Sequence, residues 1–150
     1  MIEDKLKELG LSIPEVPKPL AAYIPGIKCG NLIFTSGQVP LANGQLKYKG
    51  KVGLDISDED AKMAAQTCIL NCLGVVKSLI GDLDKIKRII KLVAFVNCTE
   101  NYTAQPAIAN GASELLVKLF DENGKHARSA VGVCGLPLGA PVEIELIVEI

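Results

Sequence analysis

Hydrophobic positions change their spacing several times along the chain, and each change marks an expected element. Between Ser57 and Gly81 apolar residues recur every three or four positions, which predicts a helix with one buried face. Ser57 followed by Asp60 is typical of a helix start, and Gly81 of a helix end. A second helix is expected at 106–120. The positions expected to face inward are Ala61, Ala64, Ala65, Cys68, Cys72, Val75, Val76 and Leu79 in the first helix, and Ile108, Ala112, Leu115, Leu116 and Leu119 in the second.

Runs rich in β-branched and aromatic residues predict strands at 31–37, 87–98, 127–134 and 141–150. In the last run apolar residues alternate with residues that are mostly glutamate, so one face is expected to be buried. The order of elements predicts an α+β domain with two helices on one face of a mixed sheet. The first three runs carry apolar or small residues on both faces, so the second face also needs a cover.

The chain is expected to form a single domain over residues 1–150. Its N-terminal arm, residues 1–19, begins with a short helix from Ile2 to Leu9 and continues into a segment with three prolines. No repeat, linker or low-complexity segment divides the sequence. An Asn-Gly pair at 43–44 predicts a turn.

Charge and composition narrow the classes of function. The net charge is −1 and aromatic residues make up 4% of the chain, so the basic and stacking surfaces that bind nucleic acid are not expected. The charged N-terminus and the lack of a long apolar run predict a cytoplasmic protein that does not enter membranes. Five cysteines, an odd number, are expected to be reduced thiols.

Arg128 is the residue that most suggests a ligand. It is one of two arginines among sixteen basic residues, and its planar fork can bind a carboxylate through two parallel hydrogen bonds. Ala130 lies on the same side of the expected strand and leaves room for a ligand. If the last two strands are neighbours, Arg128 can instead form an ion pair with a glutamate of the last strand. The residue pattern alone favours that ion pair, with Glu143, Glu145 or Glu149.

Other reactive residues give weaker signals. Cys68 and Cys72 are expected to pack as small hydrophobic residues, and no spacing of Cys and His residues completes a metal site. His126 is the single histidine, so any Ser–His or Cys–His mechanism must use it, but an ordinary loop residue is the favoured interpretation. The glycines are not spaced as in nucleotide-binding loops.

Four segments together resemble the RidA/YjgF family, whose older label is translation inhibitor or endoribonuclease L-PSP. They are "LAAYIPGIKCGNLIFTSGQVP", "KRIIKLVAFVNC", "HARSAVGV" and "LPLGAPVEIELIVEI". The resemblance implies a chorismate-mutase-like fold, a homotrimer whose sheets form a central barrel, and clefts between subunits. It also implies hydrolysis of 2-imino acids such as 2-aminoacrylate to 2-keto acids and ammonia, without a cofactor.

The resemblance also assigns roles to residues. Arg128 matches the arginine that binds the substrate carboxylate, and Glu143 the glutamate near the attacking water. The matches to residues that border the cleft are Tyr23, Ser36, Gly37, Asn110 and, through its backbone, Ala130.

The sequence departs from the family pattern in two places. Extra residues precede the second helix, and "GVCGLP" follows the arginine strand, which indicates a divergent subgroup. A non-catalytic protein that binds a small carboxylate in the same cleft is therefore the alternative function. RNA cleavage, suggested by the older label, is disfavoured by the charge, the few aromatic residues and the single histidine.

Overall fold

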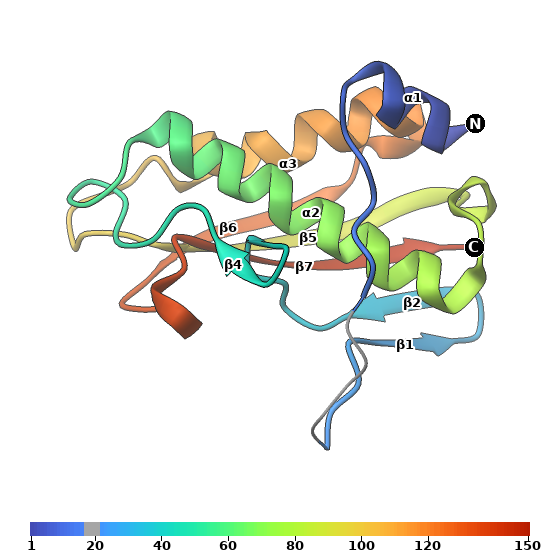
Figure 1. Cartoon of the computed structure of the whole chain (residues 1–150), viewed down its shortest axis with the longest axis horizontal. Coiled ribbons are helices and arrows are strands. Elements are labelled where there is room, and N and C mark those ends of the chain that lie inside the picture. The colour runs from blue at the N-terminus through green and yellow to red at the C-terminus, as the bar shows by residue number, and fades with distance from the viewer. Residues whose placement is uncertain (17–21) are drawn as a thin grey trace.

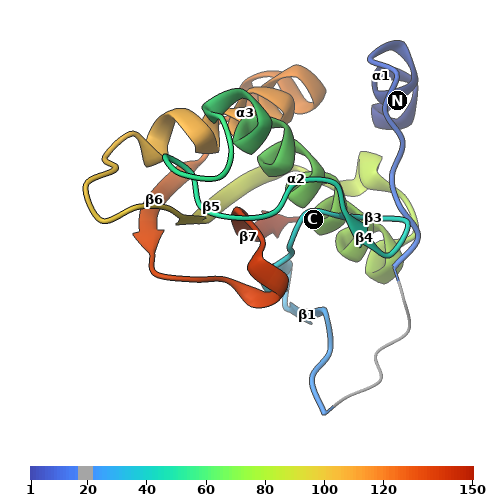
Figure 2. The same cartoon turned by 60° about the vertical axis from the view of Figure 1, so that its left-hand side comes forward.

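The alternation of residues along β7 (Val142–Glu149) decides which face of the sheet carries the helices. Ile144 and Leu146 have no exposed surface, whereas Glu143 and Glu145 point to the opposite face. In the computed structural model, which describes residues 1–16 and 22–150, the two long helices α2 and α3 lie over the buried face (Figure 1, Figure 2). The expected α+β plan, with two helices on one face of a mixed sheet, is confirmed.

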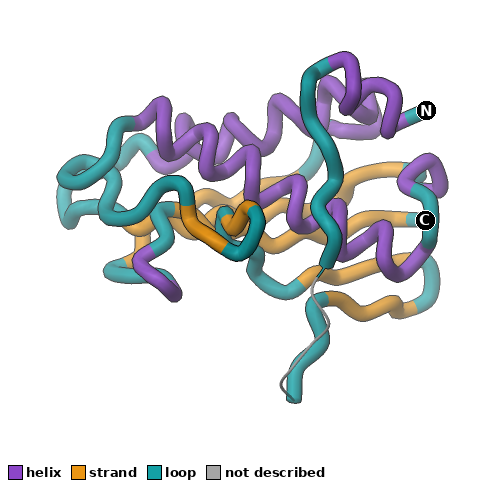
Figure 3. Tube along the Cα trace, viewed as in Figure 1, coloured by secondary structure: helices purple, strands orange, loops and turns teal. Residues whose placement is uncertain are grey.

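The sheet has five strands in the order β1-β2-β7-β5-β6, and Figure 3 shows them as one layer behind the helices. All neighbouring strands are antiparallel except β5 and β6, which are parallel because the chain crosses from one to the other through α3. The remaining elements are α1 Ile2–Glu8, β1 Gly26–Cys29, β2 Leu32–Thr35, β3 Leu41–Ala42, β4 Gln45–Leu46, α2 Asp58–Ile80, η1 Leu83–Lys85, β5 Arg88–Asn97, α3 Gln105–Phe120, η2 Asp121–Gly124, β6 Ala127–Val133 and η3 Pro137–Gly139.

Several local signals in the sequence are confirmed. The Ser57 hydroxyl caps α2 by accepting a hydrogen bond of 3.1 Å from the Asp60 backbone N–H, and Gly81 ends the helix with a φ of 82°. The hairpin between β3 and β4 turns at Asn43 and Gly44, whose φ values are both positive.

Leu79, which the sequence pattern placed on the buried face of its helix, is exposed instead. It lies in the last turn of α2, and 43% of the residue is exposed. That last turn of α2 reaches over β1, the edge of the sheet, where Leu79 covers Gly26 on one side only. The prediction failed because helical spacing does not show where the sheet beneath a helix ends.

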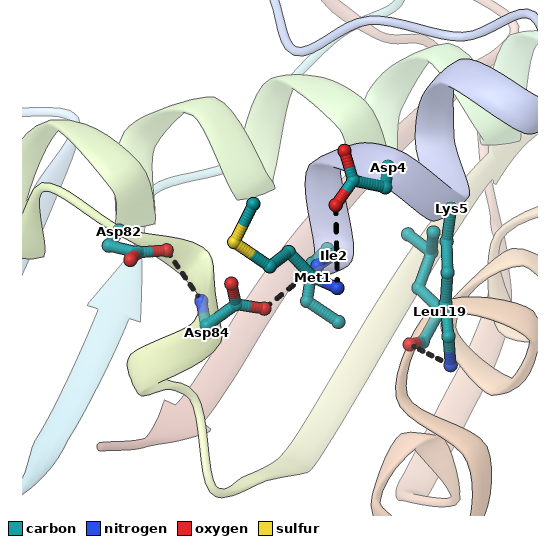
Figure 4. A network of polar contacts seen from close by, with 7 residues as sticks. All are labelled: Met1, Ile2, Asp4, Lys5, Asp82, Asp84 and Leu119. Carbon is teal, nitrogen blue, oxygen red and sulfur yellow. Dashed lines mark hydrogen bonds and ion pairs between the residues drawn. The ribbon is translucent and has the colours of Figure 1, made fainter.

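The N-terminal arm is fastened to the helical layer by its first residues (Figure 4). The Ile2 backbone N–H donates to Asp84 Oδ1 at 2.8 Å, and Lys5 Nζ donates at 3.0 Å to the carbonyl of Leu119 near the end of α3. Ile2 and Leu6 are buried. Residues 17–19 of the expected arm lie outside the described residues.

The face of the sheet opposite the helices, here called the open face, is apolar over most of its width. The register of the strands brings its apolar side chains into adjacent rows. Among them 55% of Ile27, 37% of Phe34 and 45% of Val131 is exposed. The residues of this face include Ile27, Cys29, Leu32, Phe34, Lys91, Val93, Phe95, Ala127, Ser129, Val131, Val133, Glu143, Glu145, Ile147 and Glu149.

Helix α2 is long and apolar enough to cross a membrane, but it is the central helix of the fold. In its most apolar stretch 56% of the residues are buried inside the protein. The sheet and α3 therefore cover its apolar face.

A glycine in α2 allows the arm to cross that helix. A Cβ atom on Gly74 would lie 2.9 Å from the backbone oxygen of Pro14, a contact that cannot be relieved by a side-chain rotation. Gly-to-Ala changes inside helices normally stabilise them by about 1 kcal/mol. We expect Gly74→Ala instead to lower the free energy of unfolding by about 1–3 kcal/mol, because overpacking displaces the arm.

Chemical denaturation measures this change, and limited proteolysis shows whether the arm has come loose. Met63→Ala, at an exposed position of the same helix, is the matched control. A more stable Gly74→Ala protein would contradict the close contact between the arm and α2.

Candidate functional site

Arg128 lies on the helix-covered side of the sheet. Its partner in the β5–β6 register is Leu92, which is fully buried beneath the helices. From β6 the guanidinium reaches α3, where Nη1 donates to Asn110 Oδ1 at 2.8 Å and to Ser113 Oγ at 3.1 Å. Within residues 1–16 and 22–150 the Nη2 and Nε groups contact no acceptor. The second edge of the guanidinium therefore remains available to an anion.

Helix α3 supplies both of these partners because of its period. Asn110 and Ser113 are three residues apart, so they lie on the same side of the helix, one above the other. The helix forms the crossover between β5 and β6, and this route carries it over the start of β6. Asn110, predicted to border the cleft, is thus brought to Arg128.

His126 extends this cluster by one further hydrogen bond. Its Nε2 lies 3.0 Å from Ser113 Oγ, and its Nδ1 lies 2.6 Å from the carbonyl oxygen of Gly124. Burial lowers the pKa of the imidazole. The hydrogen bond to the Gly124 carbonyl opposes this effect, and the charge of Arg128 adds a smaller lowering. His126 lies in the loop before β6, as expected, and the turn after α3 folds its ring back onto that helix.

The two residues that the sequence prediction did not connect to Arg128 are Ser113 and His126. Each carries a signal that spacing could have supplied. Ser113 follows Asn110 by three residues in a predicted helix, and His126 precedes Arg128 by two residues at a predicted strand start. Both spacings place the side chains on the same side as the arginine cluster.

The predicted ion pair between Arg128 and a glutamate of the last strand is wrong. It required β6 and β7 to be neighbours, but β5 lies between them. Glu143 pairs with Phe95 in the register and lies on the open face, opposite to Arg128. Glu149 accepts a hydrogen bond of 3.0 Å from Asn31 Nδ2. No described residue forms an ion pair with Arg128.

Glu143 is the centre of a second cluster of predicted site residues. Its carboxylate lies against Gly37, so closely that a Cβ atom at this glycine would overlap Glu143 Oε1. The backbone N–H and the hydroxyl of Ser36 both donate to the Pro25 carbonyl, at 2.8 and 3.1 Å. Tyr23 stands two residues before Pro25 and is 66% exposed. The structure therefore brings Gly37 against Glu143, with Ser36 preceding Gly37 in the chain and Tyr23 two residues from the Pro25 that Ser36 contacts.

The environment of Glu143 favours its protonated form. Burial raises the pKa of its carboxyl group, and the negative charge of Glu145 raises it further. No hydrogen-bond donor among the described residues contacts the carboxylate. A carboxyl group with a raised pKa and free oxygens is a better proton acceptor than an ordinary carboxylate.

The predicted site residues thus form two half-sites within one chain. The arginine half-site consists of Arg128, Asn110 and Ala130, which lies two residues beyond Arg128 on the same side of β6. The carboxylate half-site consists of Tyr23, Ser36, Gly37 and Glu143. The two half-sites face opposite sides of the sheet, so one chain does not bring Arg128 and Glu143 together.

The buried thiols take no part in either half-site. Cys68 and Cys72 donate hydrogen bonds to backbone carbonyls of β7, at 3.5 and 3.3 Å. Burial raises the pKa of Cys72 to about 12, so its thiol stays protonated and unreactive. The expectation that both cysteines pack as small hydrophobic residues is confirmed.

Comparison with known proteins gives a consistent family assignment. The family described as "YjgF/chorismate_mutase-like, putative endoribonuclease" matches residues 3–150. The chain is 37% identical to Protein TCP17 of Trypanosoma cruzi, over 97% of this chain and 91% of that protein. It is 31% identical to a 2-iminobutanoate/2-iminopropanoate deaminase of Dermatophagoides farinae, over 93% of this chain and 94% of that protein.

Solved structures agree with this assignment. The Agrobacterium tumefaciens protein Atu1372, described as of unknown function, is 45% identical with a TM-score of 0.93, over 99% of this chain and 92% of that one. Escherichia coli TdcF with bound serine is 25% identical with a TM-score of 0.63, over 91% of this chain and 94% of that one. The backbone thus follows Atu1372 more closely than TdcF, as expected for a divergent subgroup.

The titration of Glu143 should be visible in the stability of the fold. Its pKa in the folded protein lies above the ordinary value of 4.5, so folding favours the protonated form. Stability from this group is fully present below that ordinary value and is lost as the pH rises through the folded pKa. We therefore expect Glu143→Gln to melt at a higher temperature than the wild type at pH 7, and the difference to disappear at about pH 4.

Thermal melting across this pH range measures the difference. Glu100→Gln, at an exposed position in the loop after β5, is the control for loss of one negative charge. A Glu143→Gln protein that melts at or below the wild-type temperature at pH 7 would show that the ionised carboxylate does not destabilise the fold.

Proposed function

The chain belongs to the YjgF/chorismate mutase-like family, and from this premise we propose that it hydrolyses small 2-imino acids to 2-keto acids and ammonia. The observation that supports the proposal is the incomplete hydrogen bonding of the Arg128 guanidinium. Its guanidinium is held by the neutral groups Asn110 and Ser113, while Nη2 and Nε meet no acceptor in the described part of the chain. A substrate carboxylate would supply both the missing charge and the missing acceptors.

Small residues beside Arg128 support a small substrate. Ala130 and Gly132 follow it on the same side of β6, so only short side chains stand next to the guanidinium along the strand. Because β6 is an edge strand, its outer backbone groups can also reach a ligand. We propose that the Ala130 backbone provides such a contact.

The chemistry requires only water and a group that moves protons. Water adds to the imine carbon to give a carbinolamine, and expulsion of ammonia from that carbon leaves the 2-keto acid. Glu143 transfers protons twice: first from the attacking water to the imine nitrogen, and then from the carbinolamine hydroxyl to the amine nitrogen, which leaves as ammonia. Burial and Glu145 hold its pKa above the ordinary range, which suits a group that must both accept and release a proton.

A complete site requires more than one subunit, so we propose a homotrimer whose three sheets form a barrel. The open face is apolar and lacks a cover in the single chain, which supports its burial against further copies. In such a trimer the arginine half-site of one subunit meets the carboxylate half-site of the next, with Tyr23 lining the cleft between them. We place the protein in the cytoplasm, where its five free thiols would stay reduced.

Two alternative functions explain the same residues less well. A non-catalytic carboxylate-binding protein would need Arg128 but would not need an unpartnered Glu143 with a raised pKa. RNA cleavage would need a cationic surface, yet the net charge is −1 and the open face carries Glu143 and Glu145. Binding of 2-ketobutyrate without turnover would point to the first of these.

Arg128→Lys tests the proposed function. We expect it to lose nearly as much activity as Arg128→Ala, because a point charge cannot reproduce two parallel hydrogen bonds to a carboxylate. A loss on the order of 3–5 kcal/mol in transition-state stabilisation corresponds to a fall of about 10²–10⁴-fold in kcat/KM. Ammonia and keto-acid release is measured in the presence of a serine or threonine dehydratase, which generates the imino acid.

Arg88→Lys is the matched control, because it changes the other arginine of the chain, which is exposed at the start of β5. Near-normal turnover by Arg128→Lys would reduce Arg128 to a structural cation. A wild-type protein that releases no ammonia above the uncatalysed rate would overturn the proposed activity itself.

The proposed interface site predicts complementation between two inactive variants. Arg128→Ala and Glu143→Gln chains, unfolded and refolded together in equal amounts, should recover activity in roughly a quarter of their clefts. That fraction follows because each intact cleft draws Arg128 from one chain and Glu143 from another. The experiment measures the steady-state turnover of the mixture and compares it with the turnover of each variant refolded alone.

Light scattering of the wild type under assay conditions provides the control for assembly. A fully active monomer would contradict the shared site, and so would a stable trimer of mixed chains that recovers no activity.

A further inference from the structure

We infer that Ser113 and His126 are positioning residues that hold the Arg128 guanidinium in one orientation for a substrate carboxylate. The inference rests on the proposed function and adds to it a hydrogen-bond relay from η2 through α3 to β6. The relay runs from the Gly124 carbonyl to His126, from His126 to Ser113, and from Ser113 to Arg128.

The direction of each hydrogen bond follows from the two ends of the relay. A carbonyl oxygen can only accept, so Nδ1 of His126 carries the hydrogen that is donated to Gly124. In the neutral ring Nε2 is then the acceptor, and it receives the hydroxyl hydrogen of Ser113. A guanidinium can only donate, so the Ser113 oxygen accepts from Arg128 Nη1. Every group satisfies its neighbour, and one tautomer of His126 is selected.

The relay removes freedom from a side chain that otherwise has much of it. An arginine side chain loses rotamer entropy when it is fixed, and it binds a carboxylate through two hydrogen bonds only if its plane is correctly turned. Asn110 alone fixes one point of the guanidinium. Ser113 adds a second contact to the same Nη1 atom, and His126 fixes the direction of the Ser113 hydroxyl. The edge formed by Nη2 and Nε is then directed away from α3.

The charges around His126 agree with a neutral ring. Arg128 on β6 is the charged group that acts on it, and it lowers the pKa of the imidazole together with burial. The other contacts of the ring are the Ser113 hydroxyl on α3 and the Gly124 carbonyl on η2, which are uncharged. Lys125, which precedes His126 in the chain, forms an ion pair of 2.8 Å with the exposed Glu122. Protonation of Nε2 would place a second cation beside Arg128 and reverse the hydrogen bond to Ser113.

The same contacts argue against Ser113 as a nucleophile. Its oxygen already accepts a hydrogen from Arg128, which withdraws electron density from the atom that would attack. The third group of the relay is a backbone carbonyl, which cannot stabilise an imidazolium as a carboxylate does. The arrangement suits orientation of the arginine.

The tautomer of His126 provides a test that does not depend on activity. Because the chain has a single histidine, protein labelled with ¹⁵N-histidine gives one set of imidazole signals. The inferred relay requires hydrogen on Nδ1 and an unprotonated Nε2 at pH 7. It also requires the Nε2 signal to shift in Ser113→Ala. Hydrogen on Nε2 in the wild type at pH 7 would overturn the relay.

Substrate affinity tests the positioning role. We expect Ser113→Ala to weaken 2-ketobutyrate binding and raise KM about tenfold, because Nη1 loses one of its two acceptors, and to change kcat much less. Ser113→Thr, which keeps the hydroxyl, should restore most of the affinity. His126→Gln, which keeps an acceptor for Ser113, should bind better than His126→Ala. Thr67→Ala removes a hydroxyl from a half-buried position of α2, far along the chain from the relay, and is the control.

The outcomes separate this inference from the proposed function. A wild type that neither binds 2-ketobutyrate nor turns over imino acid would overturn the proposed function, and the inference with it. Normal wild-type binding and turnover that Ser113→Ala leaves unchanged would overturn the inference alone. Loss in Ser113→Ala without rescue in Ser113→Thr would also count against the relay, since it would reflect packing and not the hydroxyl.

Discussion

A β-strand turns each side chain to one face of its sheet, and this constraint governs how the molecule can carry out chemistry. Arg128 shares the helix side with Leu92, while Glu143 shares the open face with Phe95. Both positions are fixed by the register of a sheet whose core is fully buried, so neither can slip to the other face. Chemistry that needs both groups therefore requires a second copy of the chain. In this view the apolar open face and the divided site are two results of one sheet geometry.

Each half-site contains a charged or titratable group that no described residue neutralises. Asn110 and Ser113 solvate the guanidinium of Arg128 without neutralising it, so its attraction for an anion is kept. A carboxylate from the protein in the same place would cancel that attraction. Glu143 is partly buried beside Glu145 and contacts no donor among the described residues. Such arrangements reduce stability, and proteins retain them at sites that bind and react.

The sequence predicted the elements well because their signals are local. Helical spacing, the Ser57 cap and the exit at Gly81 sufficed for α2, and strict alternation sufficed for β7. What local signals could not supply was the order of strands. The pattern left β6 and β7 as possible neighbours, and only the position of β5 between them separates Arg128 from the glutamates. The contact between His126 and Ser113 was not predicted for a similar reason, since it depends on a turn that folds back onto α3.

The two half-sites also differ in the length of chain that each must close. Arg128 meets Asn110 and Ser113 across 18 and 15 residues, within the single β5–α3–β6 crossover. Glu143 meets Gly37 across a much longer stretch of chain. That stretch contains both long helices and the strands β5 and β6. The entropy lost in closing a loop grows with its length, so the cationic half is the less costly of the two to order. The proposed anion-binding half is thus contained in one supersecondary unit, whereas the proposed proton-transfer half depends on the completed chain.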